Sequence, residues 1–341
     1  MNIVTGATGF LGAHVVCQLL KAGKSVRAFK RHTSDLKEFN TIYNWYFKTD
    51  SDKLKAKELL FWFIVDVLDV DTLQEGMKEA EVVYHCAAMV SFFSKDRDTM
   101  MKINVEGTAN VVNLSLQNGI KQFCFVSSIA SLGRKKNGAY IDETNHWEES
   151  NLNSNYAISK YKAELEVWRG AEEGLNVVIV NPGIIIGVGA FDKGSNHLFH
   201  SVFKKIPFYS MGVKGFVDAN DVARAMLVLV ERKISHHRYV LVSENCTFKD
   251  LFFAIADGFK IKRPFIEVKP WMAGLSWRIA GIIRLFSKKG IGITKETASA
   301  AVHESLYSSQ KIKKELSFEF SPIGKTIQDC CISYLEQHKN K

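Results

Sequence analysis

Tyr156 and Lys160 stand four residues apart in the stretch NYAISKYKAE, and a pair at this spacing could do acid–base chemistry. If the stretch is helical, the two side chains share one face of the helix. A free tyrosine has a pKa of about 10, and positive charge beside it, from Lys160 together with an oxidised nicotinamide, favours the phenolate and lowers that pKa. Tyr156 could then exchange a proton with a carbonyl or alcohol oxygen, while Lys160 tunes it.

A pair of serines follows the apolar run FCFV in the stretch FCFVSSIASLG. A hydroxyl at the end of such a strand could hold a substrate oxygen beside the tyrosine. We expect Ser128 to have this role, with Ser127 as the alternative. The competing interpretation is a serine that only ends a strand.

Three glycines, Gly6, Gly9 and Gly12, follow the short apolar run at 3–5. A strand, a glycine turn and a helix together present free N–H groups and the positive end of a helix dipole to a phosphate. The first glycine allows the turn, the second lets a pyrophosphate approach, and the third lets the helix pack on the strand. The pattern therefore predicts that the chain binds a dinucleotide. Together with Tyr156 and Lys160, this would be a nicotinamide cofactor that supplies the hydride for a carbonyl reduction.

The second expected strand ends in the stretch VRAFKRHTSD. An acidic residue here would bind the ribose hydroxyls of NAD, whereas a guanidinium suits the 2′-phosphate of NADP. Lys30 and Arg31 therefore favour NADP, with Arg31 as the main contact and Thr33, Ser34 and Lys37 as helpers. An ordinary solvated charge is the competing interpretation of Arg31, and NAD remains the second choice of cofactor.

Alternating strand and helix patterns must position these groups. Over this length the alternation predicts an α/β fold with a doubly wound, Rossmann-type parallel sheet and helices on both faces. The expected strands cover 3–5, 25–30, 59–66, 82–86, 123–128 and 177–181, and the expected helices cover 10–22, 70–79, 98–118 and 154–173.

Beyond Pro182 the pattern loosens, and glycines between 183 and 215 indicate a long loop region, followed by a strand at 237–242 and several helices. We expect a dinucleotide-binding domain over 1–182. A smaller, interwoven lobe over 183–341 would mainly bind substrate, with return segments packed on the first domain. The amphipathic stretch 271–286 favours a helix packed on this lobe over a helix on a membrane surface, because basic residues do not dominate its polar face.

Composition limits the class of protein. The 341 residues are 46% hydrophobic and 24% charged, which is typical of a soluble globular protein. No apolar run reaches about 18 residues and no signal-peptide pattern precedes the glycines, so we expect no membrane span and a cytoplasmic location. Six scattered cysteines show no metal-ligand spacing, so no metal is expected. The net charge of +9 suits a phosphate-bearing ligand, since the basic residues are too dispersed for nucleic acid.

With these elements together, the chain resembles the short-chain dehydrogenase/reductase superfamily in its extended branch, the NAD-dependent epimerase/dehydratase superfamily. The matching features are TGATGFLG at 5–12, NVEGT at 104–108 and the Ser-Tyr-Lys order, and HCAAMVS, NPGIIIG and GFVDANDVARAM are similar to further landmarks. Within the branch the sequence looks most like the dihydroflavonol-reductase-like and 3-beta-hydroxysteroid-dehydrogenase-like groups. The resemblance covers nearly the whole chain.

The resemblance implies roles for further positions. Asn104 would join the catalytic set near Lys160, and Lys160 would also hold the nicotinamide ribose. Asp218 and Asp221 would tie the second lobe together. The other cofactor contacts implied are Thr8, Phe10, Leu11, Asp66, Val67, Cys86, Ala87, Ala88, Ser127, Tyr156, Pro182, Gly183 and Ile185.

The expected activity is NADP-linked reduction of a ketone or aldehyde, or dehydrogenation of a secondary alcohol. The substrate pocket should draw on 90–98, 133–140 and 183–216. Phenylalanines indicate a partly apolar substrate, although core packing explains many of them equally well: Phe92, Phe93, Phe191, Phe199, Phe203 and Phe208. The aromatic stretch TIYNWYFK at 41–48 has no role that the sequence reveals.

The alternative activity is a nucleotide-sugar epimerase with tightly bound NAD. Arg31 argues against it, and so does Asn181-Pro182, where such enzymes often have Arg-Pro. A non-enzymatic dinucleotide sensor is a third candidate, which the intact Ser-Tyr-Lys set disfavours. The resemblance also implies a homodimer formed through 98–118 and 154–173, although monomers occur in the superfamily.

Overall fold

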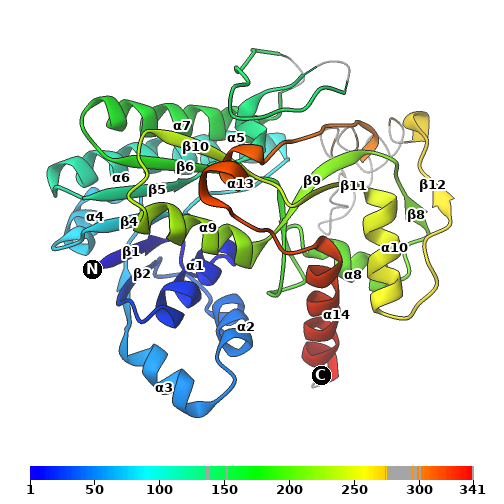
Figure 1. The fold of residues 1–341 in the computed structure, drawn as a ribbon, viewed down its shortest axis with the longest axis horizontal. Helices are drawn as coiled ribbons and strands as arrows, with labels where there is room; N and C mark the ends of the chain where they lie inside the picture. Colours follow the sequence, from blue (N-terminus) through cyan, green and yellow to red (C-terminus); the bar gives the residue numbers. More distant parts are fainter. Residues whose placement is uncertain are drawn as a thin grey trace.

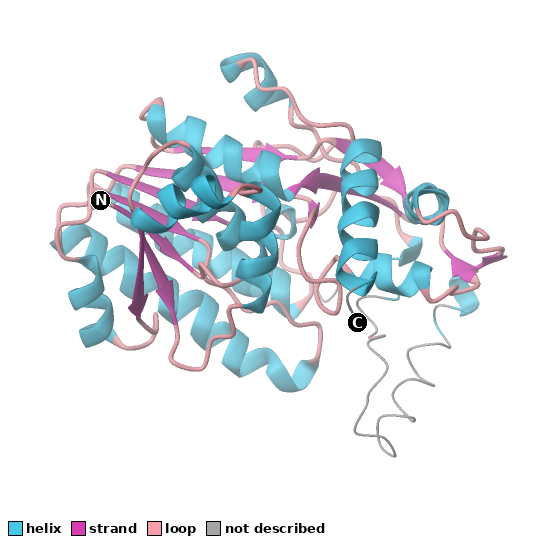
Figure 2. Cartoon of the chain, turned by 90° about the horizontal axis from the view of Figure 1, so that it is seen from below, coloured by secondary structure: helices cyan, strands magenta, loops and turns pink. Residues whose placement is uncertain are grey.

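The structure, a computed structural model, describes residues 1–135, 138–150, 153–272 and 301–339, together with 274, 294 and 298. A seven-stranded sheet with helices on both faces forms the larger part (Figures 1 and 2). All of its pairings are parallel, which confirms the predicted doubly wound fold. In spatial order its strands are β3 (Leu60–Ile64), β2 (Val26–Lys30), β1 (Asn2–Thr5), β4 (Val82–His85), β5 (Gln122–Val126), β6 (Val177–Pro182) and β10 (His237–Leu241).

The strand order reverses beside β1, because the chain runs outward to β2 and β3 and then returns to β4 on the other side. In open α/β sheets, ligands bind outside the carboxyl ends of the strands at such a reversal. The glycine turn follows β1 and Cys86 follows β4, so both predicted cofactor segments lie at this point.

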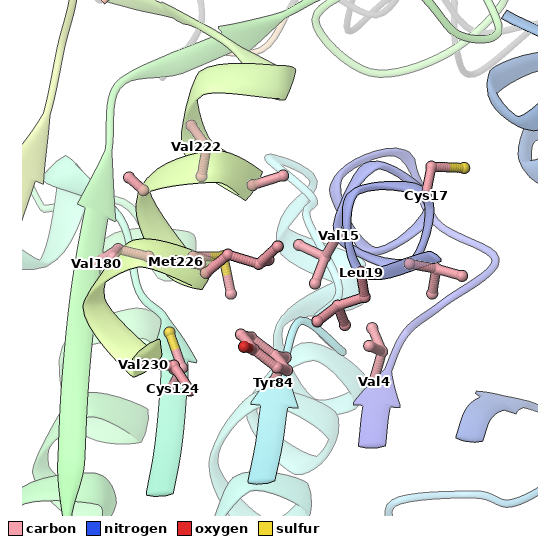
Figure 3. Packing of buried hydrophobic residues seen from close by; sticks show 14 of the residues in the cluster. Val4, Val15, Cys17, Leu19, Tyr84, Cys124, Val180, Val222, Met226 and Val230 are labelled. Carbon is pink, nitrogen blue, oxygen red and sulfur yellow. The ribbon is translucent and has the colours of Figure 1, made fainter. Parts of the chain in front are cut away.

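Two helical layers bury the two faces of the sheet. One layer contains α1 (Phe10–Lys21), α2 (Lys37–Tyr46) and α9 (Ala219–Glu231), and the other contains α4 (Val70–Met77), α6 (Gly107–Gln117) and α7 (Asn155–Glu172). Alternate strand residues serve opposite faces, so Val4 packs in the first layer and Ile3 in the second. Figure 3 shows the first layer, where Val4, Tyr84 and Cys124 of the strands face side chains of α1 and α9.

A smaller lobe follows β6. Its three-stranded sheet contains β11 (Glu244–Thr247), β9 (Val213–Asp218) and β7 (Ile184–Ile186), and β8 (Phe208–Tyr209) pairs with β12 (Ile266–Glu267). Three helices in the described part of this lobe share one apolar core: α8 (His197–Phe203), α10 (Phe248–Gly258) and α14 (Ile323–Lys339). Three later elements return to the large sheet: α9, β10 and α13 (Gln310–Leu316).

The expected long loop over 183–215 is wrong, because β7, α8, β8 and the start of β9 lie within it. Two of its glycines, Gly183 and Gly215, serve close strand contact rather than a turn. A Cβ on Gly183 would lie 2.5 Å from the carbonyl oxygen of Gly215 on the facing strand. Such pairing joins segments far apart in the sequence, and glycine-rich strands resemble loops.

The expected single helix over 98–118 is interrupted. It consists of α5 (Arg97–Met101), a π-helical turn η2 (Lys102–Glu106) and α6. Such π turns often mark functional sites, and this one carries Asn104. Among the described residues there are three further short elements: α3 (Asp50–Glu58), η1 (Ser94–Asp96) and η3 (Ile129–Leu132).

The aromatic stretch at 41–48 forms the end of α2 and packs on α1. The hydroxyl of Tyr46 donates to Asn220 at 2.8 Å and pairs with Nδ1 of His14 at 2.9 Å. Burial lowers the pKa of His14 to about 4, so this histidine stays neutral and joins α1, α2 and α9 as a structural group.

The stretch 271–286 lies outside the described residues except for 271, 272 and 274. None of the helices in the described part of the chain is long and apolar enough to cross a bilayer.

Candidate active site

The turn after β1 leaves no space for a side chain at Gly6 or Gly12. Gly6 has a φ of +65°, and a Cβ on it would lie 2.8 Å from the backbone of Ala87. A Cβ on Gly12 would lie 2.2 Å from the carbonyl oxygen of Gly6. The first N–H groups of α1 have no acceptor within the helix, so they can bind an anion. This cradle fits the pyrophosphate of a dinucleotide. Thr8 lies in the turn, and Phe10 and Leu11 begin α1.

Gly12→Ala tests the cradle. The added methyl group must displace the Gly6 carbonyl, so we expect a loss of about 1–3 kcal/mol in the free energy of unfolding, together with weaker dinucleotide binding. Gly324→Ala is the control, since a Cβ there has no neighbour within 4 Å. Urea unfolding and a cofactor titration of both variants measure the two effects. Wild-type stability and binding in Gly12→Ala would contradict the steric argument.

The adenosine end of the predicted site lies where β2 and β3 finish. Arg31 is exposed in a tight turn in which the Ser34 hydroxyl accepts its N–H at 3.0 Å. Asp66 follows β3 by two residues, and its carboxylate accepts the N–H of Leu68 at 3.0 Å. Val67 is fixed against α6, because Asn110 donates to its carbonyl at 3.0 Å. These residues therefore share the edge of the sheet that carries the glycine turn.

A buried chain of hydrogen bonds fixes the end of β4. His85 bonds Thr5 through Nδ1 at 2.7 Å and Thr108 through Nε2 at 3.0 Å. The hydroxyl of Thr5 also accepts the N–H of Ala87 at 3.1 Å, which sets the path of the chain over 86–88. Burial lowers the pKa of His85 to about 3 and raises that of Cys86 to about 12, so both groups are neutral. Sequence reasoning missed His85, because nothing in a strand pattern indicates which polar residue is buried.

Tyr156 and Ser128 meet where α7 begins. Ser154 caps this helix by accepting the N–H of Ala157 at 3.0 Å, which places Tyr156 in the first turn. Burial raises the pKa of Tyr156, and a hydrogen bond with Ser128 opposes that shift. The ring of Phe92 packs edge-on against Tyr156 at 5.9 Å between centroids. The structure thus brings together the predicted tyrosine and the preferred serine.

Lys160 is buried one turn further along α7. Its Nζ donates to the carbonyl of Val126 at 2.7 Å and lies 4.4 Å from the ring centroid of Phe125. Burial lowers the pKa of Lys160 to about 8, while Glu164 and Cys86 oppose that shift. In the protein alone, burial of the phenol raises the pKa of Tyr156. The expected lowering by Lys160 together with an oxidised nicotinamide stays a prediction.

Hydrogen bonds of the Asn104 side chain connect the loop after β4 to α7. Its side chain accepts the N–H of Met89 at 2.7 Å, donates to the Met89 carbonyl at 2.9 Å and donates to Ser159 at 3.0 Å. Ser159 precedes Lys160, so Asn104 acts on the site through the position of α7. The π turn at 102–106 is the local distortion that carries this side chain.

Glu164 organises a buried polar network beneath the site. Its carboxylate accepts hydrogen bonds from Ser127 at 2.6 Å, Ser131 at 2.8 Å and Asn181 at 3.0 Å. Arg238 of β10 completes the network with an ion pair of 3.1 Å. The Ser127 hydroxyl is therefore turned away from Tyr156 and occupied by Glu164. Neither role expected for Ser127, catalytic alternative or cofactor contact, is supported for its hydroxyl.

Three predicted residues stand between the two sheets. Pro182 ends β6, and the N–H of Gly183 donates to the carbonyl of Leu241 at 2.9 Å. Ile185 lies in β7, and its carbonyl accepts a hydrogen bond from Ser195. Gly183 is therefore bonded to β10 of the large sheet and lies close to Gly215 of β9 in the smaller lobe.

The regions expected to form the substrate pocket have mixed roles. Phe191 and Phe199 are buried in the core of the smaller lobe, so packing explains them.

Lys214 on β9, which sequence reasoning missed, donates to Ser305 at 2.9 Å. Burial, with the charge of Arg134, lowers the pKa of Lys214 to about 8. Within the expected range 133–140, positions 136 and 137 lie outside the described residues.

Comparisons with known proteins agree with this architecture. The model of the NAD dependent epimerase/dehydratase family matches residues 2–241. A putative dihydroflavonol 4-reductase of Synechocystis is 26% identical over 98% of this chain and 94% of its own, and cinnamoyl-CoA reductase 1 of Oryza sativa is 30% identical over 70% of each. The crystal structure of gox2253 matches with a TM-score of 0.79 at 30% identity, over 99% of this chain and 98% of that one.

The family match covers more than half of the chain, and the reductase relatives agree with the predicted resemblance to dihydroflavonol reductases. The cradle after β1 fits the NAD(P) cofactor that this family uses. The chain therefore belongs to the NAD-dependent epimerase/dehydratase family, the extended branch of the short-chain dehydrogenases/reductases, and is an NAD(P)-dependent oxidoreductase.

Proposed function

We propose that the protein is an NADP(H)-linked oxidoreductase that reduces a ketone or aldehyde, or oxidises the corresponding secondary alcohol. The observation that supports this proposal best is the meeting of Tyr156 with Ser128 beside buried Lys160. The reductase relatives support the same reaction type. The bound nicotinamide would supply or accept the hydride.

Each side chain of the site has its own role in the proposed reaction. Tyr156 gives its phenolic proton to the substrate oxygen in reduction and takes it back in oxidation. Ser128 orients that oxygen. Lys160 holds the cofactor ribose and, through its charge, favours the phenolate. Asn104 positions α7 for these contacts.

We further propose that the raised pKa of Tyr156 suits the reductive direction. A phenol that stays protonated at neutral pH is ready to donate. Oxidation needs the phenolate, so its rate should rise with pH, whereas the rate of reduction should fall once Tyr156 deprotonates.

The preference for NADP is proposed from Arg31, which is exposed beside the cradle. Replacing it with aspartate removes the donor for a 2′-phosphate and adds repulsion. We therefore expect Arg31→Asp to weaken NADPH binding by about tenfold or more and to leave NADH binding nearly unchanged. Fluorescence titration of both cofactors against both proteins measures this. A wild-type preference for NADH, or NAD retained through purification, would instead favour sugar epimerisation.

We also propose that two parts of the chain have different functions. Residues 1–182 bind the dinucleotide, and residues 183–341 mainly bind the substrate. The partner is a small, partly apolar carbonyl or alcohol, as Phe92 beside Tyr156 supports. We propose that the protein forms a homodimer whose interface contains residues 98–118 and 154–173. We also propose that it is located in the cytoplasm. Sedimentation velocity of the purified chain tests the dimer.

A further inference from the structure

His85 ends β4 in the interior of the protein, among aromatic rings. Its ring centroid lies 6.0 Å from that of Phe123 and 5.6 Å from that of Phe125. Nζ of Lys160 lies 4.4 Å from the centroid of the second of these phenyl rings. A phenylalanine would suit such surroundings as well as a histidine, because a buried polar group costs free energy unless it is hydrogen-bonded. What distinguishes His85 is therefore the pair of hydrogen bonds that its ring nitrogens make.

These hydrogen bonds fix which ring nitrogen of His85 carries the proton. The hydroxyl of Thr108 donates its one proton to the carbonyl of Asn104 at 2.6 Å, so it can only accept from Nε2 of the histidine. Burial lowers the pKa of His85 to about 3, so the ring is neutral and has one N–H group. Nδ1 is therefore an acceptor, and the hydroxyl of Thr5 donates to it at 2.7 Å. Thr5 in turn accepts the N–H of Ala87.

The bonds form a directed chain with the histidine at its centre. On the Nδ1 side the chain ends at Ala87, whose backbone packs on the glycine turn, since a Cβ on Gly6 would lie 2.8 Å from it. On the Nε2 side the chain reaches the π turn of Asn104. The side chain of Asn104 donates to Ser159 at 3.0 Å, and Ser159 donates to the carbonyl of Tyr156 at 2.8 Å. One side of the ring thus acts on the cofactor cradle and the other on α7.

We propose that His85 is a positioning residue that sets the cofactor cradle through Nδ1 and the catalytic helix α7 through Nε2–H. The first bond holds 86–88 on the glycine turn. The second holds the π turn at 102–106, on which the position of α7 depends. This inference rests on the proposed function, because that function gives the residues of α7 their roles. It extends that function, because His85 acts through other residues and not on the substrate itself.

Two amide variants separate the two nitrogens. Asparagine can place an accepting oxygen where Nδ1 lies, and glutamine can place an N–H group where Nε2 lies. In His85→Asn we expect kcat for carbonyl reduction to fall by about fivefold or more, with nearly unchanged NADPH affinity. In His85→Gln we expect NADPH affinity to fall by about fivefold, with nearly unchanged kcat at saturating cofactor. A residue that only stabilised the fold would change both quantities in both variants.

Thr108→Val and Ser115→Ala on α6 are a matched pair of controls. Both hydroxyls are buried and donate to the carbonyl four residues earlier, that of Ser115 to Val111 at 2.7 Å. Thr108 also accepts from His85, so Thr108→Val should lower kcat as His85→Asn does. The combination of these two changes should lose no more than Thr108→Val alone, because both remove the same bond. Ser115→Ala should keep the wild-type kcat and cofactor affinity.

Two further measurements need no substrate. The nitrogen NMR spectrum of protein with labelled histidines should show His85 as the Nε2–H tautomer, still neutral at about pH 5. Hydrogen exchange over 102–108 should become faster in His85→Asn and stay at the wild-type rate in His85→Gln. A charged or Nδ1–H ring, or equal effects of the two variants on kcat, cofactor affinity and exchange, would each overturn the proposal. If no carbonyl compound is reduced, the proposed function fails, while exchange and the cofactor titration still decide the role of His85.

Discussion

Tyr156→Phe is expected to lower kcat for carbonyl reduction by about 10²- to 10⁴-fold and to leave cofactor affinity unchanged. The substitution deletes only the hydroxyl that bonds Ser128. The phenyl ring keeps its edge-on contact with Phe92, and α7 keeps its cap at Ser154. The substrate oxygen then lacks its proton donor, while the cradle after β1 is untouched.

NADPH consumption with a panel of ketones and aldehydes measures this loss, alongside a cofactor titration. Tyr161→Phe is the matched control, because Tyr161 lies on the same helix but stacks on Trp147 at 4.5 Å. It should retain the wild-type rate. A Tyr156→Phe variant with the parent kcat would show that another group supplies the proton.

The local part of the fold could be predicted from sequence. Most strands of the large sheet up to β6 are short apolar runs that a helical pattern follows, although α2 and α3, which lie between β2 and β3, were not predicted. The glycines after β1 identify the point where the strand order reverses. Strand ends differ from the prediction by no more than a few residues, because hydrogen-bond pairing rather than hydrophobicity decides where a strand stops.

The non-local part could not be predicted. The sheet of β7, β9 and β11 depends on pairing between segments far apart in sequence, and two glycines at its closest approach resemble loop residues. Interruption of the helix at 102–106 depends on Asn104 reaching Met89 and Ser159, which no helical pattern reveals.

At the site, the roles of Ser127 and Ser128 could not be told apart from the sequence either. Adjacent residues of an extended chain point to opposite sides, so only one of Ser127 and Ser128 can meet Tyr156. The sequence favoured Ser128 without a physical reason for the choice. The structure supplies one, because Glu164 on the other side engages the Ser127 hydroxyl at 2.6 Å.

Glu164→Ala is expected to cost about 3 kcal/mol in the free energy of unfolding. The loss of one carboxylate leaves Arg238 without its ion-pair partner and frees the buried hydroxyls of Ser127 and Ser131. Unfolding in urea measures this loss. Glu166→Ala on the same helix is the control, because its partner Arg169 is partly exposed and also pairs with Glu173, so the cost should be below about 1 kcal/mol.

Glu164→Gln separates the charge of this residue from its packing, because the amide keeps the shape and an accepting oxygen. Burial lowers the pKa of Lys160 to about 8, and the Glu164 carboxylate opposes that shift, so its neutralisation should lower the pKa further. Carbonyl reduction in the proposed mechanism needs the Lys160 ammonium, so the rate of reduction falls as pH rises through this pKa. The alkaline limb of the pH profile of kcat should therefore move to lower pH in Glu164→Gln and stay in place in Glu166→Gln. A limb that does not move in Glu164→Gln, in a variant of normal stability, would confine Glu164 to a structural role.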